Sequence, residues 1–404
     1  MAIGGVSARL CAAAAVVMLL SGCGSGSSST NAPPGSPTGH TSSGTPPTDA
    51  TPGTVDAAHA VAAPGPFRAP LLTADMLIFR SHPLSAAMVS RIRHVPGVTR
   101  VERISLAQVS IEDHAITVAA VDPATYRNYN RNRVAQFQPE WDRVAGGEMA
   151  LRPQFRKQVT DSGFVRMGTS ADAPQIHVGV YAPQIPGVDA VVNKSWVKTL
   201  GMRRGNALLA STGIHTPLSI RKPIRHIVGD RASVQRMDIA ARLGLDPSTP
   251  QTAFLVGTAA DAVGSFSYSV LGGGRIAPDP GWVASHISTE TMPIIGPMTC
   301  NTLMFPQLRA ALLDIVGRSL AGAVHPEQYG GCYVPRFIAG TTTLSNHAFG
   351  LAFDVNVPEN QRGTVGQIDR QVVQIFESYG FTWGGTWHYT DPMHFEMNSL
   401  VLPG

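Results

Sequence analysis

A low-complexity stretch near the N-terminus restricts where this chain can fold. From Cys23 to about residue 65 the sequence is dominated by Gly, Ser, Thr and Pro and has almost no apolar side chains. Such a segment cannot bury a core, so we expect a disordered tether over residues 23–65. The chain has 404 residues, of which 43% are hydrophobic. The remainder is therefore long and apolar enough for two or more globular domains.

The residues before the tether are typical of an export signal. Arg9 precedes an apolar run, Leu10 to Leu20, of about half the length that spans a bilayer. The run ends in LSGC (Leu20 to Cys23), which resembles the lipobox of bacterial lipoproteins, where the cysteine is lipidated. We therefore expect a lipoprotein signal peptide over residues 1–22 and an extracytoplasmic protein, lipid-anchored to the bacterial cell membrane through Cys23. The alternative is an ordinary signal peptide with Cys23 present by chance.

The charge balance argues against a nucleic-acid partner. Lys and Arg number 31 against 27 Asp and Glu, too small an excess for a protein that binds phosphate backbones. Two stretches are locally basic, RPQFRK (Arg152 to Lys157) and RKPIRH (Arg221 to His226). We interpret them as solvated surface, and the alternative is contact with anionic wall polymer or lipid headgroups.

Two of the four cysteines are expected to pair. Cys11 leaves with the signal peptide and Cys23 would carry the lipid, which leaves Cys300 and Cys332 in an oxidising compartment. We predict a disulfide between them. A thiolate metal site is disfavoured because the chain has no CxxC spacing.

Residues 66–280 have the pattern of a mixed α+β region. Apolar spacing predicts a helix over 84–94, and QVSIEDHAITVAAV predicts a hairpin that turns at Glu112 to His114. The phrases VPGVTRVE, AVDPATYRNY and VVNKSWVKTLGMRRG look like the extracytoplasmic core domain of certain ABC-transporter permeases. This resemblance covers about residues 66–216, implies a module that binds an envelope protein partner or acts as a scaffold, and assigns no catalytic residue.

Residues 281–404 carry the candidate chemistry. Apolar periodicity predicts helices over 306–320 and 367–379, and two strands lie near them. In LAFDVNV the alternation places Asp354 on the polar side, and in MHFEM it places His394 and Glu396 opposite the apolar residues. Each strand thus offers a side chain that can bind a metal, and His347 lies just before the first strand.

These residue types match the requirements of a catalytic zinc site. Such a site uses three histidine or carboxylate ligands and leaves one position open for water. His347, Asp354 and His394 would supply the ligands. Asp391, three residues before His394, would be the general base that does not bind the metal.

Two motifs here, SxHxxGxAxD and WxxxDxMHFE, resemble those of zinc D-alanyl-D-alanine carboxypeptidases of the vancomycin-resistance type. They are also similar to the related L-alanyl-D-glutamate endopeptidases of phage lysins. The resemblance covers about residues 300–402. It implies a Zn²⁺ cofactor, peptidoglycan stem peptides as substrates, and a hedgehog-like α+β fold with a small antiparallel sheet and flanking helices.

The resemblance also assigns roles. It implies that His347, Asp354 and His394 bind zinc and that Asp391 activates water. Arg336, in CYVPRF, would polarise the scissile carbonyl and stabilise the oxyanion, and Ser345 would contact substrate. Many members have glutamate at the base position, whereas Asp391 is similar to the endopeptidase branch, so the cleaved bond stays open.

Two further residues are expected to orient the ligands. His388 and Glu396 would do so from outside the ligand set, and ordinary solvent exposure is the alternative for each. We thus expect an extracytoplasmic zinc metallopeptidase, a D-alanyl-D-alanine carboxypeptidase. The alternatives are an L-alanyl-D-glutamate-type endopeptidase and a non-catalytic zinc-binding envelope adaptor, for which the hedgehog signalling domain is an analogy.

Overall fold

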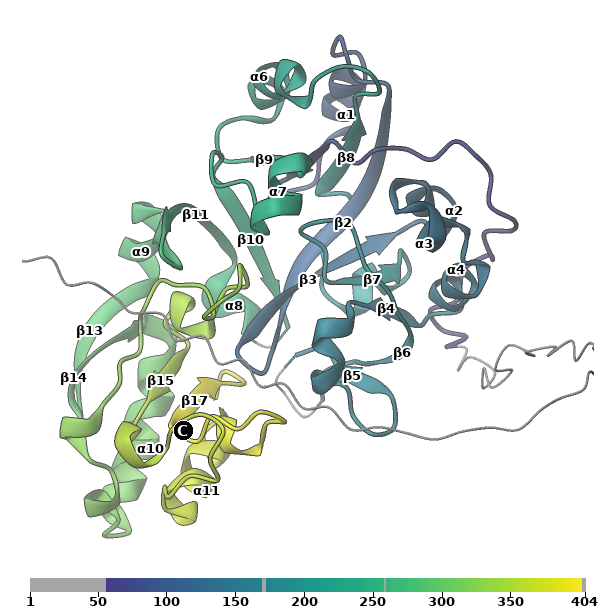
Figure 1. Ribbon diagram of the computed structural model, residues 1–404. Helices are drawn as coiled ribbons and strands as arrows, with labels where there is room; N and C mark the ends of the chain where they lie inside the picture. The colour runs from purple at the N-terminus through teal and green to yellow at the C-terminus, as the bar shows by residue number, and fades with distance from the viewer. Residues whose placement is uncertain (1–55, 169–171, 258, 402–404) are drawn as a thin grey trace, which may run out of the picture. The chain divides into compact units, whose positions relative to one another are not determined.

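The computed structural model describes residues 56–168, 172–257 and 259–401 (Figure 1). These residues belong to one unit of the chain. The predicted signal peptide, Cys23 and most of the predicted tether lie outside them. Within the described ranges, no helix combines the length and the apolar character needed to cross a bilayer.

The last ten residues of the predicted tether contact the folded region. The backbone N–H of Val61 donates to the carbonyl of Ala145 at 2.7 Å. The imidazole of His59 stacks on Trp196 with ring centroids 3.5 Å apart. Residues 56–65 therefore form part of the folded surface.

A mixed sheet organises the first two thirds of the described residues. It contains 12 of their strands, nine of them in the order β12-β11-β10-β2-β3-β7-β4-β6-β5, while β1 pairs with β8 and β9, and β8 also pairs with β2. The strands are β1 (Met76–Phe79), β2 (Arg100–Ile111), β3 (His114–Val121), β4 (Met149–Leu151), β5 (Phe164–Arg166), β6 (Gln175–Tyr181), β7 (Ala190–Asn193), β8 (Ala207–Ser211), β9 (Ser233–Arg236), β10 (Gln251–Val256), β11 (Ser265–Gly272) and β12 (Arg275–Pro278).

Short helices cover this sheet. They are α1 (Ala86–Arg93), α2 (Pro123–Tyr126), α3 (Asn132–Gln136), α4 (Gln138–Ala145), α5 (Trp196–Thr199), α6 (Pro217–Val228), α7 (Met237–Leu243) and α8 (Ala260–Val263). Helix α1 confirms the helix predicted over 84–94. It packs against α6 through a small core that includes Ile92, Ile220 and Ile224.

The predicted hairpin is confirmed and is unusually long. Strand β2 pairs with β8 through residues 100–104 and with β3 through residues 105–111. Glu112 and Asp113 form the turn with positive φ angles of 48° and 61°, as the twist of a tight two-residue hairpin requires. From residue 104 to 111, β2 is buried on both of its faces, so the hairpin tip lies inside the protein.

The C-terminal residues form a second layered structure. Helices α10 (Phe305–Gly317) and α11 (Arg370–Ser378) pack together beside the antiparallel sheet β15-β17-β16, which comprises Ala352–Asp354, His394–Met397 and Phe381–Trp383. A ribbon of β13 (Ile287–Met292) and β14 (Gly296–Asn301) follows α9 (Pro280–His286). Both predicted helices and the α+β class are confirmed.

Local interactions determine where α11 begins and where β15 ends. Helix α11 begins after Asp369, whose carboxylate accepts the backbone N–H of Gln371 at 2.7 Å. The predicted strand LAFDVNV is shorter than expected, because Asn356 has a left-handed φ of 52° that stops extended pairing. The side-chain amide oxygen of Asn356 accepts a hydrogen bond from the backbone N–H of His325 at 2.9 Å.

The core around the C-terminal sheet also includes residues before 281. Leu255 of β10 and Phe266 of β11 belong to the same buried cluster as Phe349 and Phe353. The rings of Phe266 and Phe349 are 4.9 Å apart. The domain boundary near residue 280 stays a prediction.

The predicted disulfide is present. Cys300 of β14 and Cys332 are bonded across 32 residues, with their Cα atoms 5.5 Å apart. Both side chains are buried. The bond ties the β13–β14 ribbon to the segment that leads into the candidate site.

Replacing both cysteines (Cys300→Ala with Cys332→Ala) should lower the free energy of unfolding by about 3–4 kcal/mol, because the open loop regains conformational entropy in the unfolded chain. Urea unfolding followed by tryptophan fluorescence measures the difference. An unchanged unfolding midpoint in the double variant would contradict a stabilising role for this bond.

Candidate metal centre

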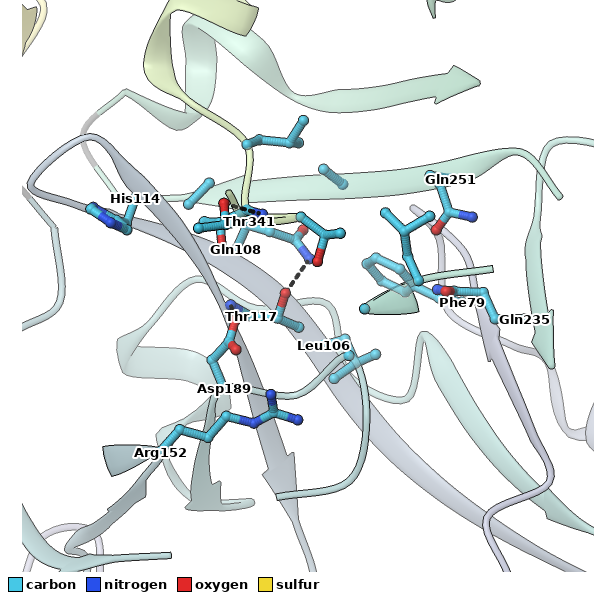
Figure 2. Close-up of a pocket in the computed structure, with 18 of the residues that line it drawn as sticks. Phe79, Leu106, Gln108, His114, Thr117, Arg152, Asp189, Gln235, Gln251 and Thr341 are labelled. Carbon is cyan, nitrogen blue, oxygen red and sulfur yellow. Dashed lines mark hydrogen bonds between the residues drawn. The ribbon is translucent and has the colours of Figure 1, made fainter. Parts of the chain in front are cut away.

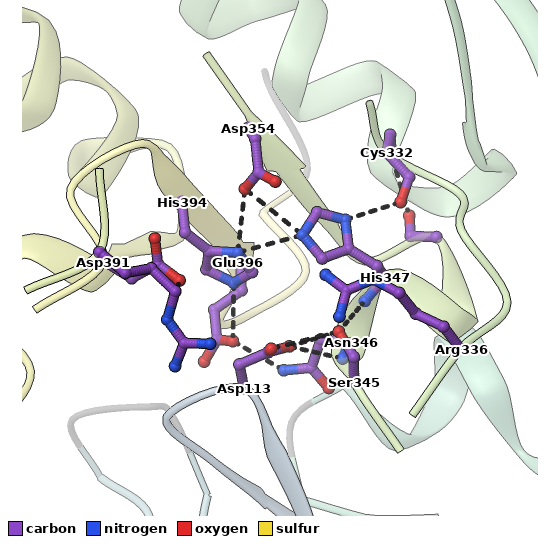
Figure 3. Close-up of polar contacts among 12 residues, drawn as sticks. Asp113, Cys332, Arg336, Ser345, Asn346, His347, Asp354, Asp391, His394 and Glu396 are labelled. Atoms are coloured by element: carbon purple, nitrogen blue, oxygen red, sulfur yellow. Dashed lines mark hydrogen bonds and ion pairs between the residues drawn. The ribbon is translucent and has the colours of Figure 1, made fainter. Parts of the chain in front are cut away.

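Three predicted ligand residues meet at one point, shown in Figure 3. The Nε2 of His347 lies 3.2 Å from the Nδ1 of His394 and 3.3 Å from the Oδ1 of Asp354. The Nδ1 of His394 is 3.2 Å from the same Oδ1. Both histidine side chains are only 2% exposed. The three atoms thus form a nearly equilateral triangle in the interior.

Strand pairing brings two of the ligands together. In the β15–β17 ladder Asp354 is directly opposite His394, although 40 residues separate them. On the other face of the ladder, the rings of Phe353 and Phe395 stack with centroids 5.5 Å apart. Burial of these rings holds the polar pair on the opposite face.

The third ligand comes from a single turn of 3₁₀ helix, η6 (Asn346–Phe349). Ser345 caps this turn, since its Oγ accepts the backbone N–H of His347 at 3.2 Å. Gly350 ends it with a left-handed φ of 67°, and a Cβ there would meet the backbone nitrogen of Asn301 at 2.7 Å. The glycine of the SxHxxG motif is therefore required by conformation and by space.

Hydrogen bonds on the far side of each imidazole determine which nitrogen faces the centre. The Nδ1 of His347 lies 2.9 Å from the carbonyl oxygen of Cys332, which can only accept, so this nitrogen carries the proton. The Nε2 of His394 faces the carboxylate of Glu396 at 3.4 Å. In their neutral forms both histidines therefore direct lone pairs at Asp354.

This arrangement fits a zinc ion. Two imidazole lone pairs and a carboxylate oxygen converge, and a cation is what stabilises such a set. Tetrahedral zinc with ligand bonds of about 2.0–2.1 Å separates its ligand atoms by about 3.3 Å, close to the three distances here. In the protein alone, burial opposes ionisation of Asp354, but hydrogen bonds from His347 and His394, when a proton occupies the nitrogen that faces the carboxylate, hold the pKa of Asp354 well below its usual range. Burial also disfavours the imidazolium of His394, yet hydrogen bonds to Asp354 and Glu396 raise its pKa.

Asp391 lies at the edge of this cluster. Its backbone carbonyl accepts the N–H of His394 at 3.0 Å, a turn that holds the two residues together. Its Oδ2 lies 3.2 Å from the Nε of Arg362, whereas its buried Oδ1 has no hydrogen-bond partner among the described residues. Burial raises the pKa of Asp391 to about 6. The free oxygen is available to accept a proton.

Arg336 is brought to the same site. Its side chain reaches toward His347 (Figure 3) and is half-buried. The guanidinium makes one long hydrogen bond, to the carbonyl of Phe337 at 3.5 Å. It forms no ion pair with any residue that the structure describes.

The remaining predicted site residues differ in their placement. Glu396 is buried beside His394 as expected, and its Oε2 also accepts the side-chain N–H of Asn346 at 2.7 Å. His388 is exposed, and within the described ranges its side chain makes no hydrogen bond to the three ligand residues. Ser345 is fully buried and its hydroxyl donates to Asp113 at 2.9 Å, a partner the sequence analysis missed.

A separate cavity of about 770 Å³ lies beside the β2–β3 hairpin (Figure 2). It is lined by hydroxyl and amide side chains, including Gln108 and Thr117, and by the charged Arg152 and Asp189. His114 of the hairpin and the loop before Ser345 also line it, whereas the three ligand residues do not. The cavity and the metal centre are thus neighbours that share a wall.

The comparisons with known proteins point to the same part of the chain. Residues 339–397 match the family model described as D-alanyl-D-alanine carboxypeptidase. The match includes all three ligand residues, Ser345 and Asp391, and begins after Arg336. Comparison with curated proteins gives no match.

The matched segment supports assignment of the protein to the hydrolases, as a metallopeptidase. Within that class it is similar to the D-alanyl-D-alanine carboxypeptidase family, whose members depend on zinc. The match covers 59 residues (339–397) and does not extend into the N-terminal region.

The purified protein should hold close to one zinc ion per chain, and His347→Ala or His394→Ala should abolish stoichiometric binding because each removes one of three ligands. Elemental analysis after dialysis measures the ratio. His177→Ala is a matched control, since His177 pairs with Glu148 at 2.7 Å away from the centre. Full zinc occupancy in both ligand variants would reject the assignment.

Proposed function

We propose that this protein is an extracytoplasmic zinc peptidase that hydrolyses peptidoglycan stem peptides, acting as a D-alanyl-D-alanine carboxypeptidase. The observation that carries the proposal is the convergence of two imidazole lone pairs and the Asp354 carboxylate beside an unpartnered oxygen of Asp391. The family match supports this substrate class. The hedgehog-like character of the C-terminal fold and the lipid anchor at Cys23 belong to the same proposal.

Each residue of the candidate site has a separate role in the proposed hydrolysis. A bound zinc ion would polarise the scissile carbonyl and lower the pKa of water. Asp391 would take the proton of the attacking water on its free Oδ1, while Arg362 holds Oδ2 in place. Arg336 would donate hydrogen bonds to the oxygen on which negative charge develops. Glu396 and the Cys332 carbonyl keep the two imidazoles oriented.

The position of Asp391 favours an enzyme over a metal-binding adaptor. Its carboxylate is buried and loses hydration, and one oxygen has no hydrogen bond in return among the described residues. Such an arrangement costs stability and is characteristic of a group that needs a reactive oxygen.

The cleaved bond separates the carboxypeptidase proposal from the endopeptidase alternative. Incubation with a defined pentapeptide muropeptide, followed by mass spectrometry, should show loss of one terminal alanine and no cleavage after the L-alanine. Cleavage between L-alanine and D-glutamate would replace the carboxypeptidase by an endopeptidase. Absence of either product from zinc-loaded protein would favour the adaptor.

Asp391→Asn should keep zinc and the fold but lower kcat by about 100- to 10,000-fold, because the amide cannot accept the proton. Asp391→Glu should retain part of the activity, since glutamate occupies this position in many proteins with the motif. Rates with a stem peptide and zinc content are measured on the same preparations. Wild-type activity in Asp391→Asn would refute the base assignment.

Arg336→Met should lower kcat by about 100- to 1,000-fold with little change in zinc content, because it removes a donor to the developing oxyanion and no ligand. The control is Arg370→Met, which removes another partly exposed guanidinium of the C-terminal region, one that stacks over Trp383 at 4.4 Å. An Arg336 variant that matches this control in kcat would exclude a role in catalysis.

A further inference from the structure

The tip of the β2–β3 hairpin is built into the metal centre (Figure 3). The Oδ1 of Asp113 accepts the backbone N–H of Asn346 at 2.7 Å and the hydroxyl of Ser345 at 2.9 Å. The Oγ of Ser110 accepts the side-chain N–H of Asn346 at 2.6 Å. The backbone N–H of Ala115 donates to the Leu344 carbonyl at 3.2 Å. The hairpin therefore binds the residues that directly precede His347.

We propose that Asp113 is a positioning residue for the zinc ligands, supplied by the N-terminal region to a site whose ligands all lie in the C-terminal region. This inference rests on the proposed zinc function. It gives residues 66–280 a role in the peptidase itself, in addition to any envelope partner they bind.

The first connection runs to His347. The Ser345 hydroxyl donates its only proton to Asp113, which leaves its lone pairs for the backbone N–H of His347 at 3.2 Å. Because η6 has four residues, it is too short to be stable by its own hydrogen bonds. The carboxylate of Asp113 thus fixes the cap that orients the turn carrying the ligand.

The second connection runs to His394. Asp113 holds the backbone of Asn346, whose side-chain nitrogen donates to Glu396 at 2.7 Å as well as to Ser110. The same oxygen of Glu396 faces the Nε2 of His394 at 3.4 Å. A shift of Asn346 would therefore move the carboxylate that selects the tautomer of His394.

The turn is held on both sides of the cluster. The carboxylate of Glu112, beside Asp113 in the turn, lies close enough to the backbone N–H of His388 to interact with it, and His388 is close to Asp391 in sequence. Asp113 is 8% exposed, and Ser110 is similarly buried. The hairpin tip therefore contacts both the turn that carries His347 and the segment next to Asp391.

A second metal ion is the competing explanation. Ligand atoms of Asp113, His394 and Glu396 lie within 4.8 Å of one another. However, both oxygens of Asp113 already accept hydrogen bonds from Ser345, and Oδ1 also accepts one from Asn346, so this carboxylate is engaged without an ion. Glu396 accepts from Asn346 with Oε2, while its Oε1 has no partner among the described residues. We therefore favour positioning, and metal stoichiometry separates the two explanations.

The test is zinc affinity of the full chain, measured by competition with a chromogenic chelator. Asp113→Ala should weaken zinc binding by about 10- to 100-fold, the range for residues that orient metal ligands. Asp113→Asn keeps an oxygen at the position of the two shortest hydrogen bonds and should recover most of the loss. In the cobalt-substituted protein, the visible absorption of Asp113→Ala should shift while that of Asp113→Asn stays near wild type.

Asp122→Ala is the matched control, because Asp122 also caps a helix of the N-terminal region, accepting the N–H of Ala124 at 3.1 Å. Zinc affinity in Asp113→Ala equal to that of this control would overturn the positioning role while leaving the zinc peptidase intact. Wild-type protein with two zinc ions, one of which is lost in Asp113→Ala, would also overturn it. Wild-type protein that binds no zinc would refute the proposed function itself.

Ser110→Ala gives a second test if Asp113→Ala folds poorly. It removes the other hairpin contact to Asn346 without leaving a charge unpaired, so its zinc affinity should fall in the same direction by a smaller factor. A zinc affinity and a cobalt spectrum of Ser110→Ala that both equal those of the wild type would contradict the proposal.

Discussion

The register of β15 on β17 is the constraint on which the rest of the site depends. Because side chains alternate along a strand, a slip of one residue would exchange Asp354 for Phe353 on the polar face and place a carboxylate in the core. The stacked rings of Phe353 and Phe395 prevent that slip by burial. Apolar packing on one face of a three-stranded sheet thus determines the distance between two candidate zinc ligands on the other.

Stabilising elements outside the sheet act on the same cluster. The backbone carbonyl of Cys332 accepts a hydrogen bond from the Nδ1–H of His347, and the sulfur of Cys332 is bonded to Cys300. The disulfide therefore restrains the group that orients one imidazole, just as Glu396 orients the other. Both histidines lie where water is excluded, so electrostatic interactions are stronger there than at the surface, and the orientation of each ring matters more.

The sequence predicted local features of this site better than its long-range contacts. Alternation in MHFEM and LAFDVNV placed His394 and Asp354 on polar faces, because side chains alternate along a strand. The disulfide was predictable because only Cys300 and Cys332 remain in an oxidising compartment. Asp113 was missed because its hydrogen bond to Ser345 spans 232 residues. The sequence pattern of a hairpin does not reveal which distant residues its turn contacts. Two adjacent acidic residues at the tip of an otherwise apolar hairpin were the available signal.

The energetics of Asp113 argue that stability alone does not explain it. Burying a carboxylate costs several kcal/mol, and among the described residues Asp113 has no lysine or arginine ion-pair partner. Two charge-assisted hydrogen bonds of about 1.5–3 kcal/mol each offset that cost approximately, so an apolar turn that packed well would be at least as stable. What an apolar turn lacks is an acceptor that directs the Ser345 hydroxyl and the Asn346 amide. The matched segment, residues 339–397, contains all three ligands but not this acceptor, and so the N-terminal hairpin is a structural component of the candidate metal centre.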